Sequence, residues 1–265
     1  MEQNTHAFPA AACRWLALSL LVIATSSGLG CEKSGSSSAT DGEAAVFGTA
    51  AKGGNVEDAR VWQSAFEAWP KEGNLNILYG SPAVQSQFEN WMRTSGEPDE
   101  VLAPVFVKLE AFNDRLLALD GGWGPLTDPD KVRSMAVRGM RKTLWADLKI
   151  SAVNGDASRA TDLLVVMCNL PRVCHAFDGT PRGLLATMGT CDGIGWGMRD
   201  IKMAGLELDA DQKKRIEAAS RWLEEPAPFG ESLDPETDAR RATMLEQFKS
   251  TGLPAILAVR SSLLD

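Results

Sequence analysis

The stretch that decides the fold runs from Asp128 to Leu170 and reads DPDKVRSMAVRGMRKTLWADLKISAVNGDASRATDLLVVMCNL. Its first part repeats apolar residues at intervals of three and four, which places them on one face of an α-helix. These residues are Val132, Met135, Ala136, Met140, Leu144 and Leu148. Gly155 ends this helix, and Asp156 supplies an N-cap for the next one. The stretch therefore predicts two antiparallel helices joined by a tight turn.

The same helical spacing extends to both sides of this stretch, beginning at Asn55. Capping residues, most of them followed by proline, mark further helix starts at Ser81, Thr180, Asp209 and Asp234. No stretch reads clearly as a strand. We therefore predict an all-α domain over residues 55–265, with about eight antiparallel amphipathic helices in a helical-hairpin or repeat-like bundle.

Two residues are predicted to interrupt helices. Pro171 would kink or split the helix that follows Asp156, because proline lacks the N–H of an α-helical hydrogen bond. Gly252 would end the last helix, which begins at Asp234.

Composition excludes some classes of protein. The 265 residues are 44% hydrophobic and 23% charged, which is the usage of folded globular proteins. The net charge of −8 argues against nucleic acid or an anionic membrane surface as a partner. The basic runs at 213–215 and 240–241 lie in acid-rich helical patterns, and we interpret them as solvated helix faces.

The amino-terminal segment has the layout of a secretory signal. An apolar run from Trp15 to Thr25 follows Arg14 and precedes small residues. A membrane-spanning helix needs roughly 20 apolar residues, so this run is short for an anchor. We predict a signal peptide over residues 1–30 and therefore export from the cytoplasm.

The end of that segment, Ser27-Gly28-Leu29-Gly30-Cys31, resembles the lipobox of bacterial lipoproteins. The resemblance implies a diacylglyceryl group on Cys31 and cleavage of the peptide bond before it, although Gly28 replaces the usual leucine. Residues 31–54 then form a Ser/Gly/Ala-rich flexible tether. Two alternatives stay open: ordinary cleavage nearby, with Cys31 as a free or paired thiol, and an uncleaved anchor.

A second resemblance concerns the turn at Gly155-Asp156. Together with Ala160 and Leu164 it is similar to the turn and second helix of a tetratricopeptide hairpin, over about 35 residues. Leu148 stands where that family has a small residue, and no second copy follows at the same period. The resemblance therefore implies a helical hairpin and not a peptide-binding repeat array.

Histidine limits the available chemistry. The chain has two histidines, and because His6 lies in the predicted signal peptide, His175 would be alone in the mature protein. This excludes the His-Glu-x-x-His zinc motif and other sites that need two histidines. The sequence has neither a Gly-x-Ser-x-Gly nucleophile motif nor a Walker-type phosphate loop, and we predict no catalytic residue, no cofactor and no metal.

Cysteines could serve a redox or structural role. Cys168, Cys174, His175 and Cys191 have the atoms for a zinc site, but the cysteine spacing is wider than that of structural zinc motifs. An exported protein can form disulfides, and Cys168 and Cys191 would lie at equal heights across a helical hairpin turning near Gly179. Three small buried thiols are the alternative.

A glycine stripe competes with that disulfide. Gly189, Gly193 and Gly197 recur every four residues and would share one face of a continuous helix. Each costs roughly 0.5–1 kcal/mol relative to alanine, so close helix packing is the expected compensation. A broken helix and a ligand-approach surface are the alternatives. If the stripe faced the helix of Cys168, Cys191 would point away and the disulfide could not form.

Aromatic residues at Trp62, Phe66 and Trp69 form a further stripe, which is more typical of a core than of a binding groove.

From all these features we expect an envelope-anchored, noncatalytic helical protein that binds or scaffolds a protein partner. The alternative is an extracytoplasmic enzyme with a pocket of dispersed Asp, Glu and Arg residues. A Trp-lined cleft with charged residues of perturbed pKa would favour the enzyme.

Overall fold

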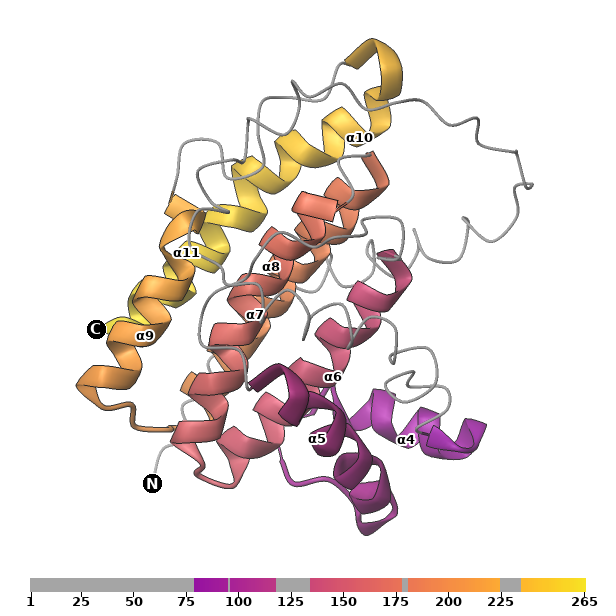
Figure 1. Ribbon diagram of the computed structural model, residues 1–265, viewed down its shortest axis with the longest axis vertical. Helices are drawn as coiled ribbons and strands as arrows, with labels where there is room; N and C mark the ends of the chain where they lie inside the picture. Colours follow the sequence, from indigo (N-terminus) through magenta and orange to yellow (C-terminus); the bar gives the residue numbers. More distant parts are fainter. Residues whose placement is uncertain (1–78, 95, 118–133, 178–180, 225–234) are drawn as a thin grey trace, which may run out of the picture. The chain divides into compact units, whose positions relative to one another are not determined.

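The computed structural model describes residues 79–94, 96–117, 134–177, 181–224 and 235–265 (Figure 1). The chain divides into two units, Met1–Glu43 and Ala44–Asp265, and all described residues belong to the second. The α-helices are α4 Pro82–Trp91, α5 Ala103–Leu117, α6 Ser134–Val153, α7 Ala157–Phe177, α8 Pro181–Met203, α9 Ala210–Ser220, α10 Pro235–Gln247 and α11 Leu253–Leu264. Short 3₁₀ segments cover Glu100–Leu102 and Arg221–Glu224. The described residues contain no strand, and the predicted all-α class is confirmed.

The predicted hairpin between α6 and α7 is present. Gly155 closes α6 in the left-handed region, with φ of +78°, which glycine adopts without strain. The Asp156 carboxylate then accepts a hydrogen bond from the backbone N–H of Arg159 at 2.9 Å and caps α7. The sequence placed both the turn and the cap correctly.

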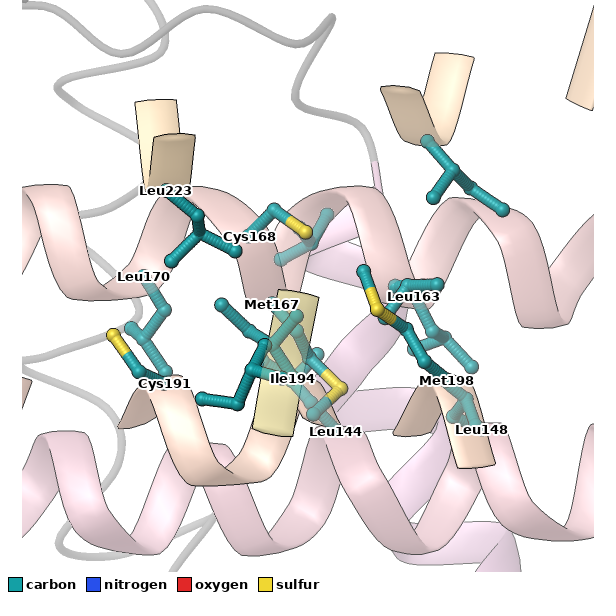
Figure 2. Packing of buried hydrophobic residues seen from close by; sticks show 14 of the residues in the cluster. Leu144, Leu148, Leu163, Met167, Cys168, Leu170, Cys191, Ile194, Met198 and Leu223 are labelled. Atoms are coloured by element: carbon teal, nitrogen blue, oxygen red, sulfur yellow. The ribbon is translucent and has the colours of Figure 1, made fainter. Parts of the chain in front are cut away.

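Three long helices, α6, α7 and α8, pack against one another (Figure 1). Residue numbers rise together along the contact between α6 and α8: Gly193 meets Arg141, and Gly197, further along α8, meets Leu148, further along α6. These two helices therefore run parallel. The helix that connects them in the chain, α7, runs in the opposite direction. Figure 2 shows the core they share, which includes Leu144, Leu148, Leu163, Met167, Ile194 and Met198.

An aromatic cluster joins α4 to α5. Phe88 and Trp91 of α4 pack against Phe106 of α5, with the Trp91 and Phe106 ring centroids 4.9 Å apart in an edge-on arrangement. The predicted start of α4 is also observed, because the Ser81 hydroxyl accepts a hydrogen bond from the N–H of Val84 at 3.3 Å.

The C-terminal helices cover the bundle from another side. Asp209 caps the N-terminus of α9, as predicted, and forms a reciprocal capping box with Gln212. α9 packs on α7, and α11 packs on α8. No helix in the described ranges combines the length and the apolar composition needed to cross a membrane.

The predicted split at Pro171 and the predicted helix end at Gly252 are not observed. α7 continues through Pro171 to Phe177, and α10 continues past Gly252 through a π-helical turn, Phe248–Gly252, into α11. The wider turn ends two residues before Pro254 and accommodates a residue that cannot donate the usual helical hydrogen bond. The predicted helix at Asn55 and the predicted start at Asp128 lie outside the described residues.

Candidate functional site

The glycine stripe of α8 lies directly against α6. A Cβ atom on Gly193 would lie 2.8 Å from both Cγ and Cδ of Arg141, and one on Gly197 would lie 3.0 Å from Leu148 Cδ1. A Cβ on Gly189 would lie 3.3 Å from the Arg141 guanidinium. α8 is continuous over these positions. The glycines thus permit a close helix–helix approach, and the helix is not broken there.

Charged and aromatic residues line the same contact. On α6 they are four residues apart, and on α8 they are again four residues apart. We call this set the α6–α8 seam: Arg141, Trp145 and Lys149 from α6, with Asp192, Trp196 and Asp200 from α8. Trp145 and Trp196 lie at the middle of the seam, with their ring centroids 4.7 Å apart.

Arg141 occupies one end of the seam. Its guanidinium donates a hydrogen bond to the backbone oxygen of Gly189 and lies 5.3 Å from the centre of the Trp196 ring. A cation over a tryptophan face is an attractive arrangement. Arg141 therefore fills the space above the glycines and holds α8 through both its backbone and its aromatic side chain.

Lys149 occupies the other end and is buried. Its ammonium donates to the backbone oxygens of Trp91 at 3.2 Å and Met92 at 3.0 Å, and also to that of Thr94. These carbonyls lie at the C-terminal end of α4, where backbone oxygens lack helical partners. Burial lowers the pKa of Lys149, and the charge of Asp200 opposes that shift. Lys149 thereby joins α4 to the bundle.

The two aspartates of the seam differ in their hydrogen bonding. Asp200 accepts a hydrogen bond from Trp145 Nε1 at 2.7 Å. Burial raises its pKa, and the bond from Trp145 and the charge of Lys149 oppose that rise. Burial raises the pKa of Asp192 to about 6, opposed by the charge of Arg141. No hydrogen bond reaches the Asp192 carboxyl from any residue that the structure describes.

A second polar cluster lies between α5, α6 and α7. The fully buried carboxylate of Asp147 receives two hydrogen bonds from Arg159, both at 2.8 Å, and one from Asn113 Nδ2 at 3.0 Å. Arg159 also donates to Asp114 at 2.9 Å. The hydrogen bond to Asp147 raises the pKa of Arg159. This two-pronged pairing of guanidinium and carboxylate fixes the three helices relative to one another.

Arg260 performs a similar task for α11. Its side chain is nearly buried and donates to the hydroxyl of Ser220 at 2.6 Å and to the backbone oxygen of Glu217 at 3.4 Å. It also pairs with the carboxylate of Glu224. Arg260, like Arg159 and Lys149, uses its charge to connect helices.

The cysteine pair does not form a bridge. Cys168 has a free thiol, and burial raises its pKa to about 12, which makes it unreactive at neutral pH. Cys191 is also fully buried, and Figure 2 shows the two sulfur atoms in different parts of the core. The alternative of a buried thiol therefore describes Cys168. Cys174 and His175 lie on α7, but their side chains are outside the described residues.

An open depression of about 570 Å³ lies along the outer face of α4. Its described lining is mostly neutral and polar, with one charged residue of each sign: Pro82, Gln85, Ser86, Gln87, Glu89, Asn90 and Arg93. None of the aspartates of the seam lines it. Within the described ranges, no group of histidine, cysteine, aspartate and glutamate could hold a metal ion.

Arg141, Asp192 and Asp200 were not among the site residues predicted from the sequence. The available signal was their spacing of four within predicted helices, but solvated helix faces carry the same pattern. The predicted lipid-attachment residue Cys31 and the Trp62 stripe lie outside the described residues.

Comparison with other proteins adds no assignment. No family model, curated protein or solved structure matches this chain. Its function must therefore be inferred from its own residues.

Proposed function

We propose that this chain is an exported, noncatalytic helical protein that binds or scaffolds a protein partner at the cell envelope, where a lipid on Cys31 holds it. The predicted signal peptide and the lipobox resemblance are the sequence features that support this location. The observation that supports a noncatalytic body is that its buried or partly buried cations bind other parts of the fold. Arg141, Lys149 and Arg159 each contact backbone oxygens, carboxylates or aromatic rings of neighbouring helices.

The alternative, an enzyme, would need charged groups that face a cavity open to substrate. Asp192 and Asp200 have the raised pKa values that such a site often shows. The depression on α4, however, is lined by other residues, and Asp200 is bonded to Trp145. These features favour a role for the seam in holding α6 and α8 together.

The anchor is tested by metabolic labelling with a radioactive fatty acid. We expect wild-type chain to carry label and Cys31→Ala to carry none, because the thioether bond needs the Cys31 sulfur. Equal labelling of both would remove the lipid anchor from the proposal and leave a secreted helical protein.

The partner is tested by site-specific photo-crosslinking in intact envelopes. A photoreactive residue at Gln87, which is exposed in the α4 depression, should capture a discrete envelope protein. The matched control at Lys214, which is exposed on α9, distinguishes a specific contact from general proximity. Absence of a discrete adduct at both positions, together with turnover of a small molecule by the purified chain, would overturn the proposal.

A further inference from the structure

The start of α5 exposes apolar side chains to solvent. Among the described residues, the large apolar side chains with exposed surfaces are Val101, Val107 and Met203, and the first two lie at this start. Val107 is the most exposed of them, at 66%. Single exposed apolar side chains are ordinary on protein surfaces, so it is their arrangement that carries information.

Exposed residues on both sides of Pro104 share one face of the helix. The 3₁₀ turn Glu100–Leu102 leads directly into α5, and residues three and four positions from Pro104 in either direction lie beside it. We call this set the α5 face: Glu100, Val101, Pro104, Val107 and Lys108, all of which are exposed. The opposite face of α5 is buried in the chain's own core. The α5 face is therefore directed away from that core.

The pattern of residues on the α5 face is self-complementary. When two copies of this face lie antiparallel about a twofold axis at Pro104, residues at equal distances on either side of the proline oppose each other. Val101 of one copy then opposes Val107 of the other, and Glu100 opposes Lys108. Apolar side chains thus meet apolar side chains, and an acid meets a base, at both ends of the contact.

The charges of the α5 face are available for such a contact. Glu100 and Lys108 are both exposed, and neither forms an ion pair with a residue that the structure describes. The neighbouring Asp99 has a different role, because its carboxylate accepts a hydrogen bond from the Val101 N–H at 3.3 Å and caps the 3₁₀ turn. Twofold symmetry would form the pair of Glu100 and Lys108 twice.

We propose that the α5 face binds the α5 face of a second copy of this chain, with the two α5 helices antiparallel. The contact is small, because a stable interface usually takes roughly 20–30 residues from each partner. The dimer is therefore weak in dilute solution and forms more readily where chains are concentrated. This inference does not depend on the proposed partner at the α4 depression.

Reversal of the charges tests the pairing. Sedimentation equilibrium of the purified full chain, at concentrations up to roughly 1 mM, should show a dimer that grows with concentration. Glu100→Lys and Lys108→Glu should each weaken it roughly tenfold, because symmetry places like charges at both ends of the contact. The combined variant should regain the wild-type affinity. Lys214→Glu, which makes the same change of charge on the exposed side of α9, is the matched control and should dimerise as wild type does.

Cysteine cross-linking tests the antiparallel register. Chains with Val101→Cys and chains with Val107→Cys, which carry tags of different mass, are mixed and mildly oxidised. The disulfide should join one variant to the other, because these two positions oppose each other across the axis. Each variant alone should cross-link less, since its two cysteines lie on opposite sides of the axis. Wild type gives the background from its natural cysteines, of which Cys168 and Cys191 are buried.

The outcomes separate clearly. Weaker dimers in the single charge variants, recovery in the combined variant and preferential linkage between the two cysteine variants support the proposal. A wild-type chain that stays monomeric over the whole range, or a dimer of equal affinity in wild type and in Glu100→Lys, would overturn it.

Discussion

Asp147 and Asp192 are both aspartates in the interior of one helical bundle, but their surroundings differ. Asp147 on α6 is fully buried and has donors from α5 and α7. Asp192 on α8 keeps some contact with solvent and has no donor among the described residues. The comparison teaches that burial alone does not decide the role of a carboxylate: the donors around Asp147 connect three helices through it, whereas partial burial without such donors raises the pKa of Asp192.

The largest expected effect concerns Asp147, the aspartate that accepts several hydrogen bonds. Asp147→Asn removes the charge that pairs with Arg159 and places an amide N–H against the guanidinium. Breaking a buried ion pair leaves the other charge poorly compensated, so we expect a loss of about 3 kcal/mol of unfolding free energy, measured by urea denaturation. Asp162→Asn is the control, because its pair with Arg215 is largely exposed and should cost less than about 1 kcal/mol. Equal losses of unfolding free energy in both variants would show that Asp147 does not connect the helices more strongly than an exposed ion pair does.

The next effect concerns the close contact between the glycines of α8 and the side chains of α6. Gly193→Ala would place a methyl group 2.8 Å from the Arg141 stem, and we expect a loss of roughly 1–2 kcal/mol despite the better helix propensity of alanine. Gly189→Ala is the matched control, since its methyl group would meet only the movable end of Arg141 at 3.3 Å. It should change the unfolding free energy by less than about 0.5 kcal/mol or stabilise the protein. A larger loss at Gly189 would contradict this account of the stripe.

The third prediction concerns the hydrogen bond from Trp145 to Asp200. Trp145→Phe keeps an aromatic ring in the seam but removes the N–H that bonds to Asp200. Because that bond favours the charged form, the pKa of Asp200 should rise further, and roughly 1 kcal/mol of stability should be lost. NMR titration of the Asp200 carboxyl carbon measures the first quantity. Trp196→Phe retains the Trp145 bond and should leave that titration near wild type; a rise of similar size in both variants would argue against the bond as its cause.

The smallest effect concerns a peripheral donor of Asp147. The Ser151 hydroxyl lies 3.4 Å from Asp147 Oδ1, which is long for a hydrogen bond of its type. Ser151→Ala leaves Arg159 and Asn113 in place and should cost less than about 1 kcal/mol in thermal or urea unfolding. A loss as large as that of Asp147→Asn would mean that the hydroxyl, and not Arg159, dominates the cluster.

Local rules predicted much of the fold. Ser81, Asp156 and Asp209 cap the helices they were expected to cap, because each cap depends on residues within three positions of it. The rules failed where packing competes with propensity. Pro171 is buried inside a continuous helix, and the backbone of Gly252 is helical, with a Cβ there only 2.7 Å from the Phe248 ring.

The glycine stripe was visible in the sequence, but the seam was not. A spacing of four identifies the shared face of Gly189, Gly193 and Gly197 without knowledge of the partner helix. The role of Arg141 depends on Gly189, which lies 48 positions further along the chain, and no local pattern reveals that contact. The donors of Asp147 likewise come from α5 and α7. Buried charges become functional or structural through such distant partners.

The contrast between Asp147 and Asp192 is tested most directly by NMR. The carboxyl carbon of Asp192 is followed from acid to neutral pH in the intact wild-type chain. The account predicts a midpoint at about pH 6. A midpoint near 3.8, the ordinary value for an aspartate, would show that Asp192 is well solvated or well bonded and would contradict the account.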